Sequence, residues 1–78
     1  MFADDAARPE LRRLDRHLAD IEVEIDHSRE LAERCRKEGS VVDALRADGR
    51  ADQLEDSLAA VMAYRTLLLE QLARQRVH

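Results

Sequence analysis

The amino-acid sequence predicts an all-α protein, an antiparallel helical hairpin in which two long stretches of helix fold back on each other. The 78-residue chain has only 2 glycines, 1 proline and 3% aromatic residues, so it lacks the residues that form turns and strands. Charged residues make up 38% of it, and apolar residues recur at helical spacing in both halves. A chain of this length forms one domain, which we place at residues 9–78 after a flexible tail over residues 1–8.

The first helix is expected to span residues 9 to 38. Pro9 is suited to the first position of a helix, and Gly39 can adopt the left-handed conformation that ends one. Between them, one stripe of side chains follows the alternating steps of three and four residues that are typical of a coiled-coil seam. This seam consists of Leu11, Leu14, Leu18, Ile21, Ile25, Ser28, Ala32 and Cys35.

The second half of the chain is expected to contain a short helix over residues 41–47, a break, and a helix over residues 51–76. Ser40 is a favourable N-cap, and Asp48-Gly49 is a dipeptide that commonly forms turns. On one continuous helix, three large apolar residues would point away from the main apolar stripe. The three residues are Val41, Val42 and Leu45, and the stripe consists of Leu54, Leu58, Val61, Leu68 and Leu72.

The segment from Leu58 to Ala73 predicts self-association. Twelve of its 16 residues are apolar, and they are distributed around the whole circumference of the helix. The segment is shorter than the roughly 20 apolar residues of a membrane span, and Arg65 and Glu70 are charged residues within it. One neighbouring helix cannot cover such a segment, so we expect a homodimer that forms a four-helix bundle. The expected interface residues are Leu58, Val61, Met62, Tyr64, Leu67, Leu68 and Leu69.

The charge pattern suggests a register for the hairpin. If the turn is centred near residue 44, Arg65 falls beside Glu24, and an ion pair between them would fix the alignment of the helices. This prediction depends on the break at Gly49, because a turn centred on Gly39 would bring Arg65 towards Arg13 instead.

Few residues suggest chemistry. Glu24 and His27 have the Glu-x-x-His spacing of ferritin-like metal bundles, but heptad phase places Glu24 at the edge of the seam and His27 on the outer face. A dimeric metal-binding bundle using these two residues is therefore an alternative to the main interpretation.

Cys35 is the single cysteine and occupies a seam position, where a thiol behaves as a small apolar side chain. No nucleophile with a base and no phosphate-binding loop is present, so neither an enzyme nor a cofactor is expected.

A second alternative is a nucleic-acid-associated protein that uses a basic cluster at the start of the first helix, namely Arg8, Arg12, Arg13 and Arg16. Interspersed acidic residues, a net charge of −4 and the scarcity of aromatic side chains argue against it. Asp4 and Asp5 directly after Met1-Phe2 do not resemble a signal peptide, and with the lone cysteine they favour the cytoplasm. We therefore expect a non-enzymatic, homodimeric interaction module that binds an unidentified protein partner as an adaptor, regulator or small chaperone.

Overall fold

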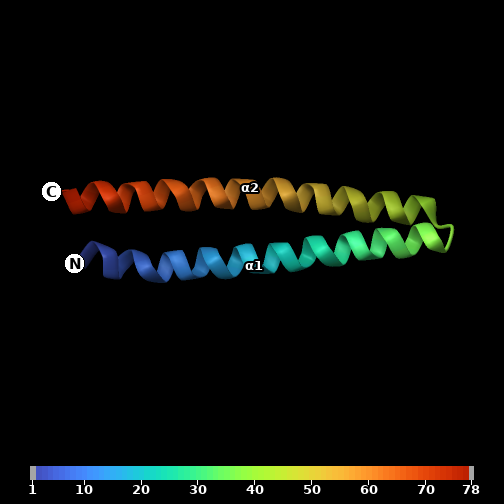
Figure 1. Ribbon diagram of the computed structural model, residues 1–78, viewed down its shortest axis with the longest axis horizontal. Coiled ribbons are helices and arrows are strands. Elements are labelled where there is room, and N and C mark those ends of the chain that lie inside the picture. Colours follow the sequence, from blue (N-terminus) through green and yellow to red (C-terminus); the bar gives the residue numbers. More distant parts are fainter. Residues whose placement is uncertain (1, 78) are drawn as a thin grey trace.

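Two long antiparallel helices make up the fold (Figure 1). The computed structural model describes the backbone of residues 2–77 and the side chains of residues 9–75. Helix α1 spans Phe2–Lys37 and helix α2 spans Val41–Val77, and together they form a rod of 60 × 15 × 10 Å. The predicted all-α class and the predicted hairpin are confirmed.

The turn lies at Gly39, where the first helix was expected to end. Gly39 has a φ of 82°, and the N–H groups of Gly39 and Ser40 donate to the carbonyl oxygens of Arg36 (3.2 Å) and Cys35 (2.8 Å). These two hydrogen bonds form a Schellman motif, which satisfies the last carbonyl groups of α1 and reverses the chain within three residues. Arg34, Arg36 and Lys37 complement the helix dipole there.

The predicted start of the first helix at residue 9 was wrong, because α1 begins at Phe2 and contains Pro9. Two features of the preceding segment favour helix. Asp4 and Asp5 place negative charge near the positive end of the helix dipole, and Ala6 and Ala7 have the highest helix propensity of any residue type.

The predicted break at Gly49 was also wrong, because α2 is a single helix across Asp48-Gly49. The predicted break rested on the positions of large apolar side chains and took no account of three alanines. Ala44, Ala47 and Ala51 are all buried against α1, and they continue the apolar stripe through the region of the expected break. Val41, Val42 and Leu45 consequently point outward, and the predicted separate helices at 41–47 and 51–76 are one.

Gly49 provides a test of this continuity. A Cβ added at Gly49 meets no atom within 4 Å, so Gly49→Ala is expected to stabilise the protein by about 0.5–1 kcal/mol through the higher helix propensity of alanine. Gly39→Ala is the matched control, since the added Cβ also meets nothing but the φ is +82°, and it is expected to destabilise by about 1 kcal/mol. Urea unfolding followed by circular dichroism would measure both, and equal effects of the two substitutions would contradict the continuous helix.

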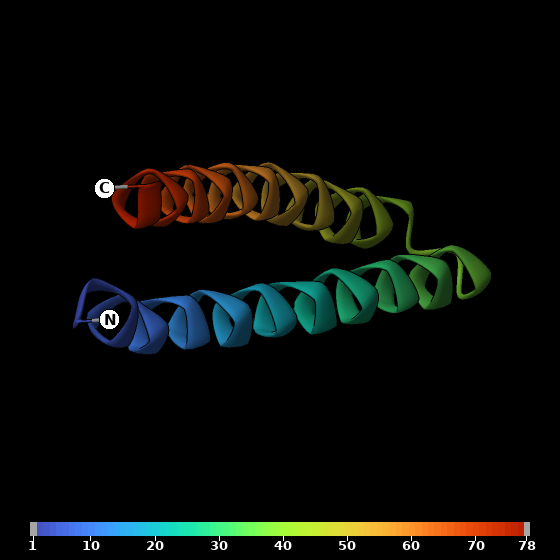
Figure 2. The ribbon, with the colours of Figure 1, turned by 60° about the vertical axis from the view of Figure 1, so that its left-hand side comes forward.

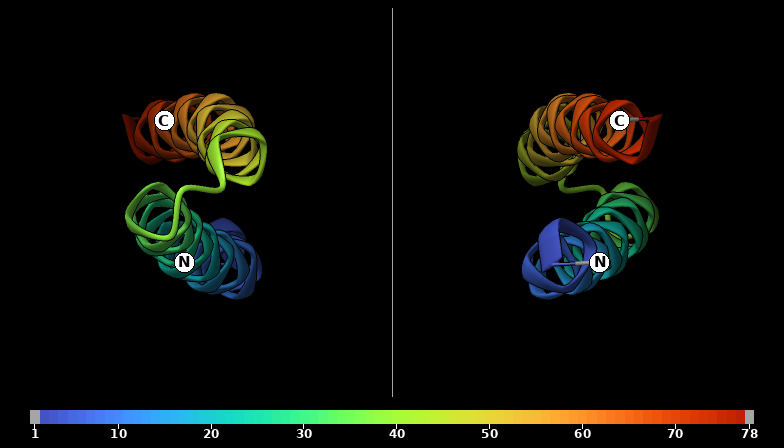
Figure 3. Two further views of the ribbon diagram at one scale, coloured as in Figure 1. Left: turned by 90° about the vertical axis from the view of Figure 1, so that its right-hand side faces the viewer. Right: turned by 90° about the vertical axis from the view of Figure 1, so that its left-hand side faces the viewer.

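The interface between the helices differs between its two ends. Towards the turn, which we call the closed end, it consists of small buried side chains: Ser28, Ala32, Cys35, Ala44, Ala47 and Ala51. Towards the termini, the open end, it consists of larger, half-buried side chains: Leu11, Leu14, Leu18, Leu58, Val61, Leu68 and Leu72. The ribbons lie closer together at the closed end, as Figures 1 and 2 show, and they cross at a shallow angle when viewed along the rod in Figure 3.

The turn at Gly39 also changes the predicted register. Within the chain Arg65 does not pair with Glu24; its Nε donates to Oδ1 of Asp15 at 2.7 Å. Glu24 instead accepts a hydrogen bond from Arg50, whose Nη2 lies 3.3 Å from Oε2. The predicted intrachain ion pair was wrong because the turn is centred about five residues earlier than the alignment assumed, which shifts every pairing along the rod.

Candidate interaction surface

Ion pairs line one side of the hairpin near the turn. Arg36 pairs with Asp48 (Nη1 to Oδ2, 2.7 Å), and Arg29 pairs with Glu55 one heptad further from the turn. The hydrogen bond to Glu55, together with its negative charge, raises the pKa of Arg29. Because seven residues make nearly two full turns, these positions lie on the same side of their helices. We call this the ion-pair side.

The ion-pair side becomes apolar beyond Glu55. The next two positions at heptad spacing on α2 are Met62 and Leu69, neither of which can form an ion pair. Asp15, which the same spacing places opposite Leu69, accepts the hydrogen bond of Arg65 from the seam instead. The charged pairing that closes the hairpin near the turn therefore gives way to an apolar surface at the open end.

Four large apolar side chains are exposed on this part of α2. The exposed fractions are 53% for Met62, 49% for Tyr64, 57% for Leu67 and 39% for Leu69. We call these four residues the open-end surface; Met62 and Leu69 lie on the ion-pair side of α2, whereas Tyr64 and Leu67 lie further round the helix. Tyr64 is tethered to α1 by a long hydrogen bond of 3.4 Å from its hydroxyl group to Oε1 of Glu10. These side chains have lost only part of their contact with water, so further burial would stabilise them.

The structure divides the seven residues expected at a dimer interface into two groups. Met62, Tyr64, Leu67 and Leu69 form the open-end surface, whereas Leu58, Val61 and Leu68 lie half-buried in the seam against α1. Arg65 occupies the same seam, between Val61 and Leu68.

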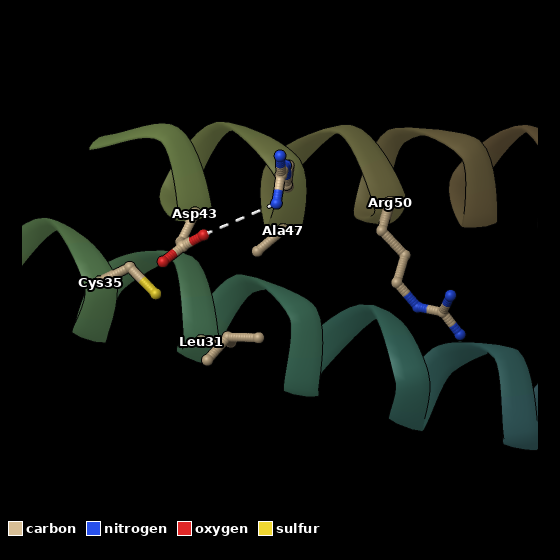
Figure 4. Close-up of a pocket in the computed structure, with 6 residues that line it drawn as sticks. Leu31, Cys35, Asp43, Ala47 and Arg50 are labelled. Carbon is tan, nitrogen blue, oxygen red and sulfur yellow. Dashed lines mark ion pairs between the residues drawn. The ribbon is translucent and has the colours of Figure 1, made fainter. Parts of the chain in front are cut away.

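A second exposed apolar cluster lies near the turn. It was not predicted from the sequence, because a break at Gly49 would have turned its side chains inward. Val41, Val42 and Leu45 are 63%, 62% and 65% exposed. Close to the turn there is also an open groove of about 380 Å³ (Figure 4). The groove is lined by Leu31, Cys35, Asp43, Arg46, Ala47 and Arg50.

The groove is lined by residues of the seam and by an ion pair within α2. Cys35 and Ala47 are buried side chains of the seam, and Asp43 pairs with Arg46 at 4.0 Å on the same helix (Figure 4). A thiol in such a position acts as a small apolar side chain, as the sequence predicted for Cys35.

The Glu-x-x-His pair is not assembled into a metal site within the chain. Glu24 is paired with Arg50, and His27 is exposed on the outer face of α1. Among the described residues, no group of three or more histidine, cysteine, aspartate or glutamate side chains is placed to hold a metal ion.

The basic cluster at the start of α1 faces solvent. Arg12, Arg13 and Arg16 are exposed, and the side chain of Arg8 lies outside the described residues. Neither helix, over the residues that the structure describes, has a stretch long and apolar enough to cross a membrane. Comparison of this chain with protein-family models, curated proteins and solved structures found no match.

Proposed function

We propose that this chain is a non-enzymatic protein-interaction module, of the adaptor or regulator type, that works as a homodimeric four-helix bundle. The observation that carries the proposal is the open-end surface, where Met62, Tyr64, Leu67 and Leu69 remain 39% to 57% exposed beside a half-buried seam. A helix in a hairpin has one neighbour, whereas a helix in a four-helix bundle has two. A second hairpin would therefore cover the side of α2 that α1 leaves open.

The energetics favour such an association. Complete burial of a large apolar side chain contributes about 1.5–3 kcal/mol relative to full exposure. Met62 and Leu69 share one side of α2 and are about half exposed, so their burial by a second hairpin would contribute about 1.5–3 kcal/mol per chain. A single helical hairpin of this size has little stability to spare. The seam of the closed end is buried by small side chains, whereas the seam of the open end is only half-buried beside Met62 and Leu69.

Light scattering over a range of protein concentrations tests this function. We expect the wild-type chain of 9.0 kDa to behave as a dimer, and Met62→Gln/Leu69→Gln to weaken the association at least about tenfold, since each substitution removes about 1 kcal/mol of apolar burial. Val42→Gln/Leu45→Gln is the matched control: its side chains are at least as exposed but lie at the turn, so the dimer should persist.

Two results would contradict the proposal. One is a wild-type chain that stays monomeric at every concentration and still unfolds cooperatively. The other is a control variant that weakens the dimer as much as the substitutions at the open end.

A further inference from the structure

We infer that the second copy of this chain packs its α2 antiparallel against α2 of the first, with the two-fold axis at Thr66. This inference rests on the proposed dimer and specifies its central helix, its direction and its register. It is supported by one exposed face of α2 and by the charged residues that precede and follow this face along the helix.

The face is an uninterrupted uncharged stripe. Its members recur at alternating steps of four and three residues, and all of them are exposed. They are Ala59, Met62, Thr66, Leu69 and Ala73. Met62 and Leu69 place the stripe on the ion-pair side of the hairpin, roughly a quarter turn from the seam, where a square bundle requires its second neighbour.

The stripe is symmetric about its middle residue. Two copies that meet antiparallel at Thr66 bring Ala59 opposite Ala73 and Met62 opposite Leu69, so small side chains meet small ones and large side chains meet large ones. The alanines allow close approach of the two helices. The Thr66 hydroxyl already donates to the carbonyl oxygen of Met62 at 3.1 Å, so its burial at the axis leaves no unpaired donor.

The flanking charges favour the antiparallel direction. Asp52 and Asp56 precede the stripe, and Arg74 follows it; all three side chains are exposed. Asp56 lies ten residues before Thr66 and Arg74 lies eight residues after it, about 15 Å and 12 Å along the helix. Antiparallel pairing therefore brings the aspartate of one copy within one helical turn of the arginine of the other, whereas parallel pairing places like charges together.

An antiparallel pairing of the two α2 helices with its two-fold axis closer to the turn is less favourable. An axis at Glu55 would pair residues 41 to 69 of the two copies, a longer overlap than the axis at Thr66 gives, but it would place Asp52, Glu55 and Asp56 of the two copies against one another. Several carboxylates of like charge would then meet at the centre of the interface. The axis at Thr66 avoids this repulsion and still covers the apolar stripe.

Cysteine cross-linking tests the register. In a Cys35→Ala background, Thr66→Cys places two thiols at the axis and should form an interchain disulfide under mild oxidation at least about tenfold faster than Ala60→Cys, an exposed position off the stripe. Ala59→Cys and Ala73→Cys should cross-link with each other when mixed, and neither should do so alone. Light scattering of the reduced variants verifies beforehand that each is a dimer.

The outcomes separate the inference from the proposed function. A dimer in which Thr66→Cys reacts no faster than Ala60→Cys, or in which Ala59→Cys cross-links with itself, overturns the register but leaves the interaction module intact. A monomeric wild-type chain overturns both.

A charge exchange gives an independent readout. Arg74→Glu should weaken the dimer about two- to fivefold at low salt, and Asp56→Arg/Arg74→Glu should restore it. Failure of the double substitution to restore association would count against the antiparallel pairing.

Discussion

Ile25→Ala is expected to lower the free energy of unfolding by about 2–4 kcal/mol, a large effect for a single truncation. Ile21 and Ile25 are the two large aliphatic side chains, among those that the structure describes, that are buried. Removal of three carbon atoms from Ile25 would lose their burial and leave a space beside Leu58, which lines the same part of the seam.

Urea unfolding at one fixed protein concentration measures this effect, because self-association makes stability depend on concentration. Val23→Ala is the matched control. Val23 is 53% exposed on the outer face of α1, so its truncation should change the free energy of unfolding by less than about 0.5 kcal/mol. Equal losses in the two variants would show that the seam of α1 does not form the core.

The seam of α1 could be predicted from the sequence because its members are distinctive. Large aliphatic residues that recur at alternating steps of three and four residues are typical of one buried helix face. Leu14, Leu18, Ile21 and Ile25 follow this pattern. The structure places all four towards α2. The end of this helix was predictable for an equally local reason, since Gly39 follows a cationic last turn.

The part of the α2 seam at the closed end could not be predicted in the same way, because alanine is compatible with both a buried and an exposed position. Ala44, Ala47 and Ala51 are buried, but Ala59 and Ala60 on the same helix are exposed. Their burial depends on how closely α1 approaches, which is a property of the pair of helices and not of either sequence segment.

The register depends on the position of the turn, and the predicted turn near residue 44 required a break at Gly49 in addition to the one at Gly39. Both Gly39 and Gly49 are preceded by polar residues, but only Gly39 adopts a positive φ. Because the predicted centre of the turn was five residues too late, the predicted partner of Arg65 was Glu24, whereas its partner in the structure is Asp15. Ion pairs such as these adapt to the register that the apolar seam imposes, and exposed pairs contribute too little free energy to set it.

The apolar excess of the open end was predictable, and so was the stripe that enters the seam, since Leu54, Leu58, Val61, Leu68 and Leu72 are all half-buried. Composition alone indicates that one neighbour cannot cover residues 58 to 73. The set of expected interface residues nevertheless combined two groups, and the structure assigns Leu58, Val61 and Leu68 to the seam and Leu67 and Leu69 to the surface.

Ala51→Leu is expected to destabilise the protein by about 1–3 kcal/mol, although leucine is more hydrophobic than alanine and has a similar helix propensity. Ala51 and Ala32 each have 0% exposure, so the closed end has no space for three further carbon atoms. The helices would have to separate there, which would expose Ser28 and Ala47 and lengthen the neighbouring ion pairs. Ala60→Leu, at an exposed position of the same helix, should leave the free energy of unfolding within about 0.5 kcal/mol of the wild type.

Thermal and urea unfolding of the two leucine variants distinguish close packing from simple hydrophobic gain. If the closed end is held together by the close approach of small side chains, only Ala51→Leu should lower stability, and Ala51→Gly should lower it too, by about 1 kcal/mol, through helix propensity and lost burial. A leucine at position 51 that stabilises the protein would mean that α1 and α2 are further apart at the turn than the buried alanines indicate.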